Sequence, residues 1–121
     1  MSEEHIDYTK FVARLKKSGE AIIADLTPTS ADALHMAVGV SGEAGELLDA
    51  VKKYAIYAKA LDRTNVIEEL GDLEFFMEGL RQILGITREQ TLDANKQKLG
   101  KRYAEKCYSN TAANLRADKQ T

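Results

Sequence analysis

The chain has 121 residues, of which 44% are hydrophobic and 30% are charged, and its formal net charge is −2. These totals are typical of one soluble domain with its own core. They argue against a protein that binds duplex nucleic acid, because no arginine-rich block or basic stripe is present. They also argue against a membrane protein, since no apolar run approaches the ~20 residues that a span requires.

Two features at the ends of the chain indicate a cytoplasmic location. The first residues, MSEEHIDYTK, are polar and acidic and so predict neither a signal peptide nor a transit segment. The single cysteine, Cys107, cannot form a disulfide within the chain, which fits a reducing compartment.

The first half of the sequence predicts two helices. The first spans about residues 5–25, and Gly19 is expected to break or bend it. The second is long, from about 31 to 59, and Thr29 or Ser30 is expected to cap its start.

The second half predicts two more helices. The third covers about residues 65–84, with Asp62 or Thr64 as its cap and Gly85 as its end. The fourth covers about 87–106, and its opening T-x-x-Q is a capping box.

Helices separated by short connections predict an all-α fold, a four-helix bundle. We assign residues 1–106 to one helical domain and residues 107–121 to a polar C-terminal tail. The second predicted helix carries apolar residues on most of its faces. A second copy of the chain is therefore expected to cover part of this apolar surface. This pattern predicts a homodimer.

Two pairs of acidic residues border the apolar stripes of the two central helices. Glu43 and Glu46 form an E-x-x-E pair on the second helix, and Glu69 and Asp72 form an E-x-x-D pair on the third. Residues three apart lie on one helix face. If the two helices pack antiparallel, four carboxylates converge, and such a cluster is self-repelling unless a cation compensates it.

Carboxylate oxygens select hard divalent cations, so the pattern predicts Mg²⁺, Mn²⁺ or Ca²⁺ rather than zinc. The alternative is that one acidic pair is compensated by basic side chains on the same two helices. The candidates are Lys52, Lys53 and Arg63.

Three glycines recur every third residue in the middle of the second helix, at Gly39, Gly42 and Gly45. Each costs about 0.5–1 kcal/mol relative to alanine, so each needs a reason. Close approach of another helix is the favoured explanation, and room for phosphate or metal beside Glu43 is the alternative.

The stretches VGVSGEAGELLDAVKKYAIYAK and NVIEELGDLEFFMEGL resemble the MazG-like nucleoside triphosphate pyrophosphohydrolases, part of the all-α NTP pyrophosphatase superfamily. The mark of that family is E-x-x-E, a spacer and E-x-x-D on the two central helices of a bundle, and the similarity covers about residues 30–105. The resemblance implies an enzyme that hydrolyses a nucleoside triphosphate between its α and β phosphates. The products are a nucleoside monophosphate and pyrophosphate, a reaction suited to house-cleaning of the nucleotide pool.

The resemblance also implies a role for each acid. Glu43, Glu46, Glu69 and Asp72 would hold Mg²⁺, and Glu46 would in addition be the catalytic residue that orients or deprotonates the attacking water.

The resemblance further implies a set of substrate-binding residues. The stretch DANKQKLGKRY is similar to the closing motif of the family, so Asn95, Lys98 and Arg102 would bind the phosphates and the sugar. Lys53 would join them, and His35 would meet the base or the sugar. The alternatives are a solvated helix face for the polar residues and a buried, hydrogen-bonded side chain for His35.

Two other functions stay open at this point. One is hydrolysis of a related phosphoanhydride, of the dUTP or phosphoribosyl-ATP type. The other is a non-catalytic helical module for dimerisation or regulation that keeps its acids for structure.

Overall fold

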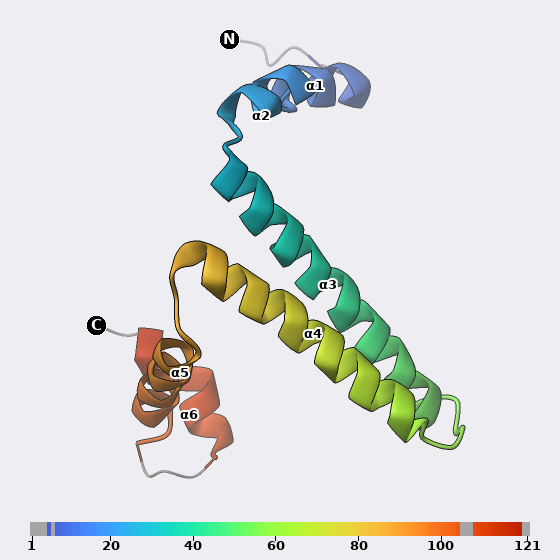
Figure 1. Cartoon of the computed structure of the whole chain (residues 1–121), viewed down its shortest axis with the longest axis vertical. Coiled ribbons are helices and arrows are strands. Elements are labelled where there is room, and N and C mark those ends of the chain that lie inside the picture. Colours follow the sequence, from blue (N-terminus) through green and yellow to red (C-terminus); the bar gives the residue numbers. More distant parts are fainter. Residues whose placement is uncertain (1–4, 6, 105–107, 120–121) are drawn as a thin grey trace. The chain divides into compact units, whose positions relative to one another are not determined.

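A computed structural model describes residues 5, 7–104 and 108–119, and within these ranges the chain is helical and contains no strand. The predicted all-α class is therefore confirmed (Figure 1). The chain divides into two compact units, residues 1–31 and 32–121. Its elements are α1 (Tyr8–Leu15), α2 (Gly19–Asp25), α3 (Pro28–Ala55), α4 (Arg63–Leu84), α5 (Arg88–Arg102), α6 (Asn110–Leu115) and the 3₁₀ helix η1 (Ala117–Lys119).

The helix predicted over residues 5–25 is broken close to Gly19, as expected, because the chain leaves the helical conformation between α1 and α2. Lys16 and Ser18 are both extended, with ψ of 136° and 153°. The Ser18 hydroxyl accepts a hydrogen bond from the Ala21 N–H at 3.1 Å and so caps α2. The break thus precedes Gly19, which is the first residue of α2.

α3 begins earlier than predicted and has a different cap. Its first residue is Pro28, whose fixed φ suits the first turn of a helix. The Thr27 hydroxyl accepts from the Ser30 N–H at 3.0 Å, and Ser30 Oγ accepts from the Thr27 N–H at 2.9 Å. Thr27 therefore caps the helix, in place of the predicted Thr29 or Ser30. α3 ends at Ala55, short of the predicted residue 59.

The predicted ends of α4 are confirmed. The Asp62 carboxylate accepts from the Asn65 N–H at 3.1 Å, which caps the start of the helix. Gly85 follows the last turn with φ of 68°, a left-handed conformation that glycine adopts without a steric penalty.

The predicted capping box of α5 is also present. Thr87 Oγ1 accepts from the Gln90 N–H at 3.0 Å, and Gln90 Oε1 accepts from the Thr87 N–H at 2.8 Å. α5 ends at Arg102, before the predicted residue 106, and Cys107 lies outside the described residues.

α3 and α4 run antiparallel, side by side (Figure 1), and small residues mark their closest contacts. A Cβ at Gly39 would overlap the ring of Phe76, and a Cβ at Gly79 would lie 2.5 Å from the Met36 sulfur. Gly42 and Gly45 have open space instead. The predicted close approach of helices therefore holds for Gly39 but not, in the single chain, for the other two.

The segment predicted to be a polar tail contains the short helices α6 and η1. The Ser109 hydroxyl caps α6 by accepting from the Ala112 N–H at 3.0 Å. Arg116 ends α6 with φ of 47°. Asp118 of η1 then reaches Arg102 of α5, so the segment folds back onto the preceding helix.

Little apolar surface is covered in the single chain. Among the described hydrophobic residues Ala50 alone is buried, with 7% of its surface exposed, and it lies on α3. The side chains of Val38, Leu48 and Phe75 are 60%, 67% and 66% exposed. Over the described residues, no helix combines the length and the apolar character needed to cross a membrane.

Candidate metal centre

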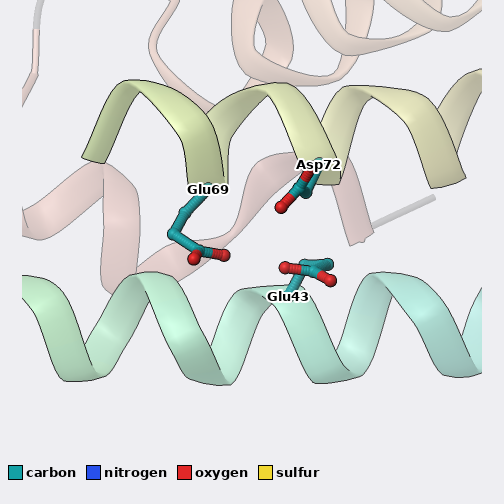
Figure 2. Close-up of side chains that lie close together, drawn as sticks. All are labelled: Glu43, Glu69 and Asp72. Atoms are coloured by element: carbon teal, nitrogen blue, oxygen red, sulfur yellow. The ribbon is translucent and has the colours of Figure 1, made fainter. Parts of the chain in front are cut away.

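Three of the four predicted acids meet between α3 and α4. Glu43 comes from α3, whereas Glu69 and Asp72 come from α4, one turn apart. One carboxylate oxygen of each lies within 4.8 Å of the others. Figure 2 shows Glu43 pointing toward α4 and the other two side chains pointing toward α3. The i, i+3 spacing on α4 and the antiparallel pairing together produce this group.

The acidic group has unmet hydrogen-bonding capacity. Glu43 Oε2 and Glu69 Oε2 are buried and have no hydrogen-bond partner. Asp72 is exposed, so the group opens to solvent on one side. A buried acceptor without a donor is unfavourable, and two that face each other also repel.

The pKa of Glu69 reflects this environment. It is raised from 4.5 to about 7, first by a hydrogen bond with the Glu43 carboxyl, which requires a proton between the two groups. Partial burial and the negative charges of Glu46, Glu43 and Asp72 raise it further. A cation among the carboxylates would replace the proton and remove the repulsion.

The donor set fits a hard divalent cation. Its ligands are carboxylate oxygens, and two of them are buried acceptors that no donor satisfies. The alternative of salt bridges finds no support among the described residues. Lys53 Nζ pairs with Asp49 at 3.1 Å, Lys52 Nζ lies 5.4 Å from the centre of the Tyr57 ring, and no ion pair reaches Glu43, Glu69 or Asp72.

Glu46, the fourth predicted acid, is outside this group. It lies on α3 one turn beyond Glu43 and is exposed to solvent. Its charge contributes to the raised pKa of Glu69, so it acts on the group without being part of it.

The structure does not bring His35 or Lys53 into the acidic group. His35 is exposed on α3, about two turns before Glu43, so the alternative of a buried histidine does not hold in this chain. Lys53 is also exposed, and its ammonium is compensated by Asp49 on the preceding turn.

The three predicted binding residues of α5 differ in their exposure to solvent. Asn95 and Lys98 are exposed, whereas the Arg102 side chain is only 18% exposed. Arg102 donates from Nε to Asp118 Oδ1 at 2.9 Å and from Nη2 to Oδ2 at 3.4 Å. No pattern in the sequence predicts this partner, because Asp118 is a single acid in a polar segment sixteen residues away.

An open apolar hollow of about 340 Å³ lies beside the paired helices and was not anticipated from the sequence. Val40 of α3, one turn before Glu43, is part of its wall. Arg81 is the charged residue of the wall, but Glu78 at 3.0 Å and Glu74 at 3.8 Å already compensate it. The full lining is Ala37, Val40, Met77, Leu80, Arg81, Leu84, Ile86 and Thr91.

Comparison with known proteins identifies the family. Residues 32–106, more than half of the chain, match the family model described as the MazG nucleotide pyrophosphohydrolase domain. Neither the curated proteins nor the solved structures contain a match to the chain. The matched region contains most of α3 and all of α4 and α5, and it includes all three residues of the acidic group. On this match, and in agreement with the resemblance seen in its acidic motif, the chain belongs to the MazG nucleotide pyrophosphohydrolase family.

Proposed function

We propose that the protein is a Mg²⁺-dependent nucleoside triphosphate pyrophosphohydrolase. It would convert a ribo- or deoxyribonucleoside triphosphate and water into the nucleoside monophosphate and pyrophosphate, and so clear unwanted nucleotides from the cytoplasm. One observation carries the proposal: a chain of this family brings three carboxylates together between two helices and leaves two of their oxygens buried without a donor.

In this proposal Glu43, Glu69 and Asp72 hold the cation together with Glu46, whose charge acts on Glu69. Bound Mg²⁺, or Mn²⁺ in its place, would neutralise phosphate charge and polarise the α-phosphorus. Without that compensation the negative charge of the carboxylates would repel the negatively charged triphosphate.

Glu46 is the proposed general base. Its carboxylate is exposed and lies outside the group of three, so it is available to accept a proton from water. The water oxygen would form a bond to the α-phosphorus as the bond from that phosphorus to the bridging oxygen breaks. Pyrophosphate leaves with the electron pair of that bond, and Glu46 keeps the proton until solvent removes it.

Binding of the phosphates and the sugar is assigned to Asn95, Lys98 and Arg102 of α5, with Lys53 and His35 on α3. All five carry polar or cationic side chains suited to an anionic ligand, and Arg102 supplies a planar fork for phosphate. The proposal includes a homodimer, or a tetramer of two such dimers. The support for this is the large amount of apolar surface that the single chain leaves exposed.

The test is a panel of ribo- and deoxyribonucleoside triphosphates incubated with the pure protein in Mg²⁺ and in EDTA. Metal-dependent release of pyrophosphate is the expected result. Orthophosphate release would instead indicate different chemistry, and turnover restricted to dUTP or phosphoribosyl-ATP would indicate a specialised relative. No turnover of any compound would favour a non-catalytic module.

Variants of the acidic residues test the site assignment. Glu46→Gln should lower kcat by about 10²–10⁴-fold with an unchanged helical circular dichroism spectrum, because it removes only the proton acceptor. Glu69→Gln should weaken activation by Mg²⁺. Glu89→Gln, an exposed acid on α5, is the matched control and should behave as the unmodified chain. Full activity in Glu46→Gln would contradict the assignment of the base.

A further inference from the structure

The segment formed by residues 108–119, here called the C-terminal clasp, is attached to α5 through a charged pair. Asp118 places both carboxylate oxygens against the Arg102 guanidinium, at 2.9 Å from Nε and 3.4 Å from Nη2. The Asp118 side chain is 2% exposed, so this carboxylate is almost fully desolvated and is paired with Arg102. The pKa of Asp118 is correspondingly lowered, first by its hydrogen bonds with Arg102.

An aromatic contact accompanies this ion pair. The Tyr108 side chain is 70% exposed. The Tyr108 ring lies 5.6 Å from the Tyr103 ring, centre to centre, in a tilted arrangement. The ion pair is the part of this attachment that another anion can replace, because it depends on the charge of Asp118.

A phosphate group can replace that anion. The guanidinium presents its N–H groups as a fork that matches a carboxylate and a phosphate equally well. The Nε and Nη2 donors that Asp118 occupies form one edge of this fork. A polyphosphate carries several negative charges against the single charge of Asp118, so it competes favourably for the same donors.

We propose that Asp118 and the substrate polyphosphate compete for Arg102, so that the C-terminal clasp is closed in the free protein and is released when the polyphosphate binds. This inference rests on the phosphate-binding role given to Arg102 under the proposed function. The clasp is then an internal inhibitor. It lowers the fraction of molecules with an available Arg102 and weakens the apparent affinity for substrate by the same factor.

Asp118→Asn tests the competition because it keeps the shape of the side chain and removes its charge. The apparent KM for nucleoside triphosphate should fall by about threefold to tenfold, with kcat unchanged, since more molecules are then competent to bind. Asp93→Asn is the matched control. Asp93 is an exposed acid on α5, and its variant should keep the KM of the unmodified chain.

Hydrogen–deuterium exchange of the full chain gives a readout that does not need turnover. Titration with inorganic pyrophosphate, at ionic strength matched with sodium chloride, should speed amide exchange in residues 108–119 of the unmodified chain and of Asp93→Asn. In Asp118→Asn the exchange should be fast from the start and should not respond to pyrophosphate.

The outcomes separate the two proposals. Release of the clasp by pyrophosphate without hydrolysis of any nucleotide would reject the enzymatic function and retain the competition. Hydrolysis with an unchanged KM in Asp118→Asn would overturn the competition and retain the enzyme. Amide exchange in residues 108–119 that does not change on addition of pyrophosphate would also overturn the proposed competition.

Discussion

Glu69 is the residue that should make the stability of the metal-free protein depend on pH. Its pKa is raised from 4.5 to about 7 in the folded chain, chiefly by the hydrogen bond with Glu43. Between these two values the folded state binds more protons than the unfolded state. The free energy of unfolding should therefore fall as the pH rises through this window. Urea denaturation of EDTA-treated protein at both ends of the window measures this.

The same titration predicts how Mg²⁺ acts. A cation binds the ionised carboxylates, so its stabilising effect should be larger at the upper end of the window than at the lower end. Glu69→Gln, which cannot ionise at this position, should flatten the pH dependence of the metal-free protein. A variant that retains the full slope would show that another group is responsible.

The residues of the acidic group were predictable to the extent that local spacing decides their position. The i, i+3 spacing on each helix put Glu43, Glu69 and Asp72 on facing sides, and the structure brings them within 4.8 Å. Spacing could not show that Glu46 lies outside the group. That depends on how the two helices are rotated against each other, which tertiary packing determines.

At the scale of the elements, Gly39 of α3 lies directly against the ring of Phe76 of α4. Gly39→Ala should destabilise the protein by about 1–3 kcal/mol, because the added methyl group would overlap the ring and force the helices to shift. Gly42→Ala is the control. That position has open space, so the better helix former should stabilise the protein by about 0.5–1 kcal/mol. Urea denaturation compares the two, and equal effects would contradict a close contact at Gly39.

The ends of the elements were predictable where a local hydrogen bond determines them. Asp62 caps α4, Gly85 ends it, and Thr87 opens α5 with a capping box, as the sequence indicated. Each signal lies within a few residues of the helix end that it sets.

Elsewhere the local signals competed or were absent. The break before α2 lies just ahead of Gly19, because Ser18 offers a cap one residue before it. The pairing of Arg102 with Asp118 joins residues sixteen apart, and no periodicity or cap encodes it. Contacts of this kind depend on how a later segment folds back, which composition alone does not reveal.

At the scale of the whole molecule, the single chain covers little of its apolar surface. Among the described hydrophobic residues only Ala50 is buried, although large apolar side chains occur along every long helix. Burial of apolar surface is the main favourable contribution to folding, at about 25 cal/mol per Å². The proposed association with a second copy would add to the stability of such a chain, and folding and assembly should then be linked.

Leu48 tests that linkage. Its side chain is 67% exposed, whereas Leu47 beside it is half-buried and Ala50 is covered. If a second copy covers this side of α3, Leu48→Glu would bury an unpaired charge and prevent association. Sedimentation velocity should then show a smaller species than for the unmodified chain, with a lower midpoint of thermal unfolding. Lys96→Glu places the same charge on an exposed polar position of α5 and should change neither property. Identical sedimentation of the two variants, both at the size of a single chain, would mean that the exposed apolar surface is not an interface between copies.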